Sequence, residues 1–294
     1  MRHHQTLQAG FTLVEMIVVL TIAGLMSVVV MQFITTPIEA YVDQSRRGEL
    51  VDEAQLAAER ITHDVRLALP NSIRVGCGGR CLEFLRAVSG GRYRAGPPGN
   101  ELSFLPADAD TSFDVLGSLN DTGGLVTSNT TGACLNGNAA CVAIYNTGYD
   151  GNDAWRGDNI ATLSGLSLSP ASISFLNDEF RGGQRAFPAS SPGQRFFIVD
   201  TPITFLCDPV NGTIRRYLGY SINADQDDVD THAELTGLGN PAEHSLLANR
   251  VSECQFEYTP GSPTRNALLT ARLSISEAGE TISLLKQIHV DNVP

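Results

Sequence analysis

The 294-residue chain has little positive charge and almost no lysine. It holds 20 Lys and Arg residues against 32 Asp and Glu, its formal net charge is −12, and Lys286 is its single lysine. Binding to nucleic-acid phosphates depends on clustered Lys and Arg side chains, so a nucleic-acid partner is not expected. Apolar residues, in contrast, are not scarce: 42% of the residues are hydrophobic and 18% are charged. This composition indicates a folded protein.

Motifs that carry catalytic chemistry are also missing. The histidines of the later chain, His63, His232, His244 and His289, are dispersed and form no HExxH motif, and neither a GxSxG elbow nor a phosphate-binding glycine loop is present. We therefore expect no enzymatic activity. Trp155 is the only tryptophan; stacking on a sugar is one interpretation, and anchoring a loop onto the protein is the favoured one.

One acidic segment partly resembles a calcium-binding loop. Asn223, Asp225 and Asp227 supply oxygen ligands at alternate positions, and Glu234 stands at the twelfth place. However, Asp228 occupies the position that requires glycine for the sharp turn, and no flanking helices are evident. A solvated acidic loop is the favoured interpretation and a weak calcium site is the alternative; no other cofactor is expected.

The six cysteines are an even number, as in proteins that fold in an oxidising compartment. Six cysteines permit fifteen pairings, and proximity in the sequence favours the first with the second, the third with the fourth, and the remaining two with each other. A zinc site is the alternative, but the C-x3-C and C-x6-C spacings fit it poorly and no histidine is close. The candidates are Cys77, Cys81, Cys134, Cys141, Cys207 and Cys254.

The N-terminus joins a short polar segment to a long apolar one. Residues 1–10 are polar and include Arg2, whereas residues 11–34 contain one charged side chain, Glu15. A helix over this apolar segment is about 36 Å long, which is enough to cross the hydrocarbon core of a bilayer. A secretory signal peptide would have a shorter apolar core followed by a small-residue cleavage site, so we expect the segment to remain in the mature protein. Arg2 predicts a single-pass orientation with the C-terminal part outside.

Glu15 is the unusual residue of this segment. An ionised carboxylate at the middle of a bilayer costs about 2.5 kcal/mol or more, so such residues are usually functional. The alternative is a carboxylate near enough to the membrane surface to reach headgroups and water. The residue by itself does not separate the two interpretations.

The spacing of Gly10, Phe11 and Glu15 provides the missing information. The segment Gly-Phe-Thr-Leu-Val-Glu, with a short leader before it and an uninterrupted apolar run after it, resembles the N-terminus of type IV prepilins. The resemblance implies that prepilin peptidase cleaves after Gly10 and methylates the new amine of Phe11. It also implies that Glu15 of one subunit neutralises the Phe11 amine of the next, which offsets the desolvation of both groups and sets the register of assembly.

Beyond the apolar segment, the sequence predicts a continued helix and then a β-rich head. Pro37 should kink the helix or break it locally. An apolar stripe through residues 50–68 predicts a helix face packed on the head, with Asp64 and other charged residues on the remaining faces, and Pro70 ends the pattern. The expected fold class is therefore α+β. Its parts are a leader at 1–10, a transmembrane assembly helix at 11–35, an amphipathic helix at 36–69 and an antiparallel β-rich globular head at 70–294.

Short strand-like runs separated by Gly, Pro, Asn or Asp make up the expected head. Residues 268–275 alternate well between apolar and polar side chains, and a turn at 277–280 predicts a C-terminal hairpin. Residues 108–158, which are rich in Gly, Asn, Thr and Asp, are expected to form long surface loops. The expected strands are 72–75, 82–85, 102–105, 141–145, 172–176, 195–199, 201–206, 214–220, 251–258, 268–275 and 281–290.

Parts of the head carry a second, weaker resemblance. Residues 146–159, 191–200, 204–208, 217–220 and 289–294 resemble the MshO-type minor pilin of the mannose-sensitive haemagglutinin pilus, a relative of PilW-type minor pilins and of the J-type pseudopilins of type II secretion. The resemblance implies a minor subunit that initiates or caps the fibre near its tip. It implies an inner-membrane location with a periplasmic head, and as partners the major and other minor pilins, prepilin peptidase and the assembly platform. A minor pseudopilin and a tip adhesin are the alternatives.

Overall fold

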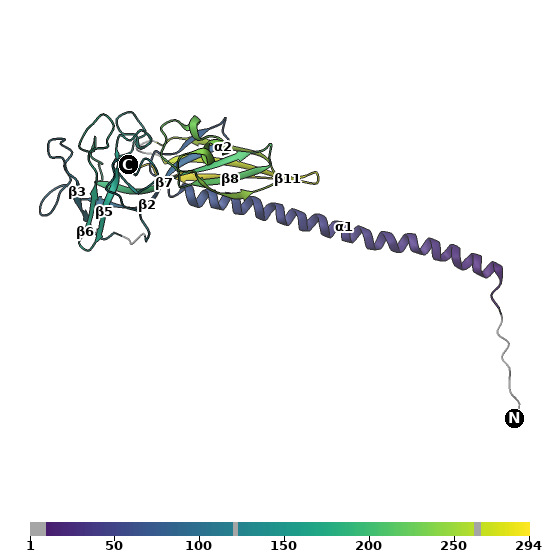
Figure 1. Cartoon of the computed structure of the whole chain (residues 1–294). Coiled ribbons are helices and arrows are strands. Elements are labelled where there is room, and N and C mark those ends of the chain that lie inside the picture. Colours follow the sequence, from purple (N-terminus) through teal and green to yellow (C-terminus); the bar gives the residue numbers. More distant parts are fainter. Residues whose placement is uncertain (1–9, 120–122, 262–265) are drawn as a thin grey trace, which may run out of the picture. The chain divides into compact units, whose positions relative to one another are not determined.

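The computed structural model describes residues 10–119, 123–261 and 266–294, so the expected leader lies, up to residue 9, outside the described residues. The chain divides into two compact units, Met1–Val51 and Asp52–Pro294. Helix α1, Leu13–Val65, makes up most of the first unit and continues into the second (Figure 1). The later part of the chain is an antiparallel β-rich head, which confirms the α+β fold class.

Of the two predicted effects of Pro37, a kink or a local break of the helix, the break does not occur. The helix is continuous from Leu13 to Val65 with Pro37 inside it. Proline removes one amide donor from the helical ladder and crowds the preceding turn. The neighbouring turns remain helical on both sides of Pro37, so one missing donor is tolerated.

Within the second unit, the last turns of α1 are part of the core. Ala54, Ala57, Ile61 and Val65 are at most 2% exposed, which confirms the apolar stripe. Asp64 was expected on a face away from the core, but it is only 2% exposed, because a buried arginine from the sheet contacts it.

The helix ends at Val65, before the expected end at residue 69. The following residues instead make sheet-like bonds to the second strand. The amide of Leu69 donates to the carbonyl of Leu85 at 2.8 Å, and that of Ala87 donates to Leu67 at 2.7 Å.

In the part of the chain that the structure describes, nine strands form the larger sheet, in the order β1-β2-β3-β6-β5-β4-β7-β8-β9 with an additional β2–β7 pairing, and all their pairings are antiparallel. The strands are β1 (Arg74–Gly76), β2 (Cys81–Tyr93), β3 (Ser112–Leu116), β4 (Cys141–Ala143), β5 (Ile160–Leu168), β6 (Ala171–Phe175), β7 (Arg195–Asp208), β8 (Thr213–Leu218) and β9 (Glu243–Ala248).

The two longest of these strands, β2 and β7, are shared between two substructures. The first part of β2 and the last part of β7 join β1, β8 and β9 in an open sheet. Their other parts join β3, β6, β5 and β4, and because β2 pairs with both β3 and β7, these six strands form a closed ring of pairings. Register shifts between Arg86 and Ser89 mark the change from one substructure to the other.

Each of the six strands in this ring contributes buried side chains to one apolar cluster. The cluster is rich in aromatic rings; Phe113 and Phe196 meet edge to face with centroids 5.2 Å apart, and Phe180 and Phe187 do so at 4.7 Å. Burial of one such side chain stabilises the fold by about 1.5–3 kcal/mol. The ring therefore carries a substantial share of the head's core.

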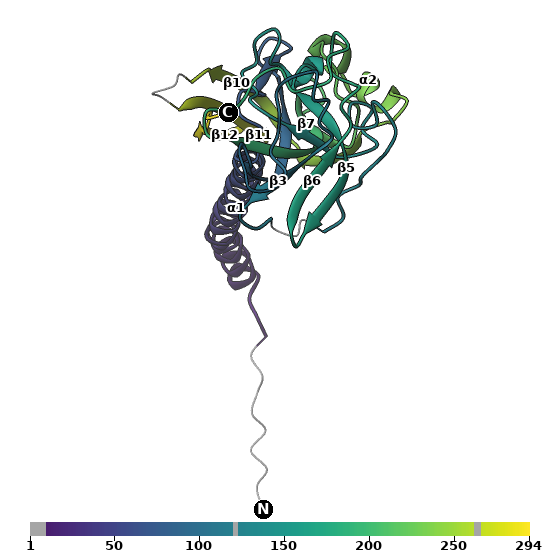
Figure 2. The ribbon, with the colours of Figure 1, turned by 90° about the vertical axis from the view of Figure 1, so that its left-hand side faces the viewer.

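A second, three-stranded sheet has the order β10-β11-β12, with β10 at Val251–Thr259, β11 at Ala267–Glu277 and β12 at Glu280–Val290. Figure 2 shows these strands together on one side of the head, away from β5 and β6. The predicted hairpin is confirmed, since Ala278 and Gly279, at φ of 50° and 85°, turn β11 into β12. Both φ values are positive, as hairpin turns of this length require.

The strand prediction is wrong in several places. Residues 102–105 form no strand, whereas 195–199 and 201–206 belong to one continuous strand, β7. Three strands were not anticipated: β3, β5 and β9. Between the strands lie two short 3-10 helices, Ala154–Arg156 and Gln226–Val229, and the short helix α2, His232–Gly237.

Candidate functional site: the N-terminal assembly segment and the anchors of the head

The start of α1 is closed by a reciprocal pair of side chains. The Thr12 backbone amide donates to a Glu15 carboxylate oxygen at 3.0 Å, and the Thr12 hydroxyl donates to the same oxygen at 2.9 Å. In return, the Glu15 amide donates to the Thr12 hydroxyl at 3.3 Å. This is a capping box, which satisfies amides at the helix start that have no partner within the helix.

The capping box gives Glu15 a role within a single chain. Its carboxylate is held at the positive end of the helix dipole, next to the residues where cleavage is predicted. Thr12 was not singled out from the sequence, although Thr-x-x-Glu before an apolar run is the pattern of a capping box. Gly10 and Phe11 precede the helix, and Phe11 is 83% exposed, so the Gly10–Phe11 bond lies in accessible, non-helical backbone.

The side chains of α1 in the first unit are strongly apolar and exposed. Leu13–Val65 is the one helix in the described part of the chain that is long and apolar enough to cross a membrane, with a best-window mean hydropathy of 2.5 and none of that window buried. Leu13, Leu20 and Phe33, for example, are 76%, 63% and 77% exposed. Apolar surface of this extent needs lipid or neighbouring helices to cover it.

The acidic segment is organised by its own backbone. The Asn223 side chain accepts from the Asp225 amide and the Asp225 side chain from the Asp227 amide, each at 3.1 Å. The Glu234 carboxylate accepts from the Thr231 amide in the capping box of α2. No group of three or more His, Cys, Asp or Glu side chains that could hold a metal ion is found among residues 10–119, 123–261 and 266–294. The calcium site therefore stays a prediction from the sequence.

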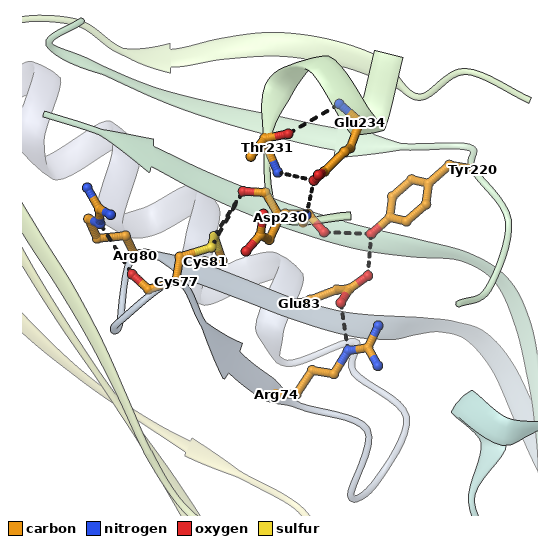
Figure 3. The surroundings of a disulfide bond; sticks show 10 residues. Arg74, Cys77, Arg80, Cys81, Glu83, Tyr220, Asp230, Thr231 and Glu234 are labelled. Atoms are coloured by element: carbon orange, nitrogen blue, oxygen red, sulfur yellow. Dashed lines mark hydrogen bonds and ion pairs between the residues drawn. A yellow bond between two sulfur atoms is a disulfide. The ribbon is translucent and has the colours of Figure 1, made fainter. Parts of the chain in front are cut away.

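A buried polar network lies beside this segment and the first disulfide (Figure 3). Glu83 is fully buried; it accepts from the Arg74 guanidinium at 2.6 Å and from the Tyr220 hydroxyl at 2.8 Å. The Thr204 hydroxyl extends the network through a hydrogen bond with the Tyr220 hydroxyl. Burial raises the pKa of Glu83 and Arg74 opposes the rise, while burial and the nearby Glu83 charge hold the pKa of Tyr220 well above its ordinary value.

Trp155 is an anchor for the loop that carries it, as the favoured interpretation predicted. It is 7% exposed, and its indole Nε1–H donates to the Ser72 carbonyl at 2.8 Å. The guanidinium carbon of Arg74 lies 3.7 Å from the centre of the indole ring, in cation–π geometry. With one face covered by Arg74 and the edge bonded to Ser72, the ring has no exposed face on which a sugar could stack.

Three disulfides follow the predicted pairing, and no described cysteine is free. Cys77–Cys81 and Cys134–Cys141 close short loops, with Cα atoms 5.4 and 5.2 Å apart. Cys207–Cys254, at 6.5 Å, joins β7 of the larger sheet to β10 of the smaller one.

A buried ion pair fastens the end of α1 to the larger sheet. Arg216 of β8 donates to Asp64 at 2.6 Å, and the two side chains are 8% and 2% exposed. Burial acts to raise the pKa of Asp64, but bonds from His63 and Arg216 and the charges of Arg216 and Arg60 together lower it.

In the comparison with known protein families, the match lies at the N-terminus of the chain. Residues 6–31 match the model of the prokaryotic N-terminal methylation motif. No curated protein and no solved structure matches the chain. The matched segment contains Gly10, Phe11, Thr12 and Glu15 together with the first turns of α1. The match supports a type IV pilin-like protein that is assembled through its N-terminal helix.

Proposed function

We propose that this chain is a minor pilin that helps to initiate or cap an MSHA-type type IV pilus. The observation that carries the proposal is the register of the N-terminus. Gly10 and Phe11 stand directly before an exposed apolar helix, the capping-box carboxylate of Glu15 lies in its first turn, and all three residues fall within the methylation motif.

Each segment of the chain has its own role in this proposal. Residues 1–10 are a leader that prepilin peptidase removes after Gly10, and the amine of Phe11 is then methylated. Residues 11–35 cross the inner membrane, residues 36–69 lead into the head, and residues 70–294 form the periplasmic head. Three disulfides suit that oxidising compartment.

Glu15 sets the register by exchanging partners. In the single chain its carboxylate accepts from Thr12. In the assembled fibre, the amine of Phe11 from a neighbouring subunit replaces Thr12, and the opposite charges offset each other's desolvation. The exchange requires little movement, because the capping box already holds the carboxylate at the end of the helix.

The size of the head favours a minor subunit over a major one. About 225 residues follow the helix, which is a large head for a subunit repeated densely along a fibre. The proposal is structural rather than enzymatic, and its partners are the major and other minor pilins and the assembly platform. A minor pseudopilin of type II secretion has the same N-terminal requirements, so the test has to separate the two systems.

The test is deletion of the gene in the native bacterium, with complementation by the wild-type chain. We expect major pilin to disappear from sheared surface fractions while secreted proteins stay at their normal level. Intact pili with failed secretion would transfer the protein to the pseudopilus. Intact pili and normal secretion would contradict both assembly roles and favour a tip adhesin.

A further inference from the structure

One edge of the smaller sheet is long, regular and uncovered. Among the residues that the structure describes, β12 pairs only with β11, through eleven consecutive residue pairs without a register shift. Within the described ranges, residues 281–290 form no other backbone hydrogen bond. A straight edge of this length is a template for another strand, and proteins commonly interrupt such edges with bulges or proline. This edge has neither.

Two backbone bonds establish which groups of β12 point outward. The Ser276 amide of β11 donates to the carbonyl of Arg250 on the β10 side, and the Phe256 amide of β10 donates to Gly79, away from β11. Because backbone groups alternate in direction along a strand, these two bonds fix the parity of the whole sheet. The residues of β12 that direct N–H and C=O outward are Thr281, Ser283, Leu285, Gln287 and His289.

The surface near this edge is hollowed. Two adjoining hollows, of about 460 and 380 Å³, share Arg66 and Leu67. β12 lines them with Lys286 and Val290, and β2 lines the larger one with Val88–Gly90. Leu67 is 38% exposed and Leu285 of β12 is 55% exposed. An added strand would therefore find apolar contacts as well as backbone partners.

The charged side chains around the hollows favour an added strand that carries acidic residues. Arg66 and Lys286 both line the smaller hollow, and neither forms an ion pair with another described residue, although the chain carries a net charge of −12. A lysine on an edge strand usually discourages pairing, because an incoming strand buries it. A carboxylate on that strand removes the penalty by pairing with the cation. Glu59 lines the same hollow, and its single negative charge leaves the net charge of Glu59, Arg66 and Lys286 positive.

We propose that the outer edge of β12 binds an extended acidic segment of a neighbouring filament subunit as an additional strand. The outward groups of Leu285 and Gln287 form its backbone bonds, and Arg66 and Lys286 pair with its carboxylates. The identification of the partner as a filament subunit rests on the proposed function.

Photo-cross-linking of the full chain in native cells tests this contact. Benzoylphenylalanine replaces Leu285 on the edge, and in a control chain it replaces Val210, which is 90% exposed on the β7–β8 turn. We expect a cross-link from position 285, and not from 210, to an acidic extended segment of another pilin subunit, identified by mass spectrometry of the joined peptides.

Two variants examine the backbone and charge contributions separately. Gln287→Pro removes an outward N–H without removing a bond to β11, and Gln287→Ala is its matched control. Arg66→Glu with Lys286→Glu reverses the cations. We expect Gln287→Pro and the charge reversal each to lower the cross-link about tenfold, which corresponds to about 1.4 kcal/mol, and Gln287→Ala to leave it unchanged. Formation of all three disulfides serves as the control for correct folding. If the Gln287→Pro variant does not form them, Ser283→Pro is used in its place, because it removes another outward N–H donor of β12.

The outcomes distinguish this inference from the proposed function. A deletion strain that loses its pili, combined with no cross-link from position 285, would overturn the edge contact alone. A cross-link to a second copy of this chain, to a segment without acidic residues, or one unaffected by Gln287→Pro would also overturn it. Normal piliation in the deletion strain would overturn the proposed function, whatever position 285 captures.

Discussion

The buried Asp64–Arg216 pair leads to a quantitative prediction, because the two partners are not equally replaceable. Asp64 also accepts from Arg60 at 3.2 Å and contacts His63 at 3.1 Å. Asp64 is the one side-chain partner of Arg216 in the described part of the chain, and the Arg216 Nη2 atom is already buried without a bond. Removal of Asp64 therefore leaves a buried cation unpaired, whereas removal of Arg216 leaves Asp64 with Arg60 and His63 as partners.

We expect Asp64→Ala to lower the free energy of unfolding by about 3–5 kcal/mol, the usual cost of an unpaired buried charge. For a head of this size, the melting temperature should fall by roughly 6–20 °C. Arg216→Met should cost clearly less. The double variant Asp64→Leu with Arg216→Met should recover most of the loss, because well-packed apolar residues often replace a buried ion pair without penalty.

Circular dichroism of the full mature chain in detergent micelles, followed during heating, measures these differences. Glu101→Ala is the control, since Glu101 is exposed and exposed substitutions usually change stability by less than about 0.5 kcal/mol. If Asp64→Ala costs less than about 1 kcal/mol, or if Arg216→Met costs more than Asp64→Ala, the reasoning is refuted.

The same pair has a pH dependence of known sign. The pKa of Asp64 is lowered in the folded chain, so its carboxylate contributes stability that is complete above the ordinary aspartate pKa of about 3.9. That contribution is lost as the pH falls through the lower, folded-state pKa. The stability difference between wild type and the double apolar variant should therefore change in this acidic range.

Three further predictions concern other parts of the chain. Glu15→Ala should retain membrane insertion and cleavage but lower recovery in sheared pili about tenfold, the effect of about 1.4 kcal/mol, and normal recovery would contradict the register pairing. Trp155→Phe should cost about 1–3 kcal/mol in thermal unfolding because the buried Ser72 carbonyl loses its donor; an unchanged melting temperature would remove the anchoring role. Serine at both Cys207 and Cys254 should cost about 4 kcal/mol, since the bridged residues are 47 positions apart, and a change below about 1 kcal/mol would contradict the loop-entropy estimate.

Local patterns account for the features that the sequence predicted well. The alternation in residues 268–275 is visible in the structure, where Leu269, Leu273 and Ile275 of β11 are at most 3% exposed. The pairing of Cys77 with Cys81 and of Cys134 with Cys141 followed from proximity, and most of the extent of α1 followed from its apolar run and its later stripe. Each of these features depends on residues that are close together in the sequence.

Features that depend on distant partners were missed. In the sequence, Asp64 looks like an exposed charge on the helix. Its buried partner, Arg216, lies 152 positions later in the chain. Residues 102–105 look like a strand, but the structure gives them no continuous ladder; Leu102 donates one isolated bond to the carbonyl of Arg94. β5 has serines and a glycine among its apolar residues, and its place in the ring is decided by β4 and β6. Thr12 is different, because its capping pattern was local and recognisable.

The sharing of β2 and β7 has a consequence for the order in which the head can fold. Glu83 of β2 pairs with Thr204 of β7, so more than a hundred residues separate the two strands. As the chain emerges during synthesis, β2 appears early and its partner appears late. Neither the open sheet nor the closed ring is complete without that pairing, so the two substructures cannot fold one after the other. The early part of the head has to wait, with β2 unpaired, until residue 208 has emerged, and such delayed long-range pairing makes folding slow.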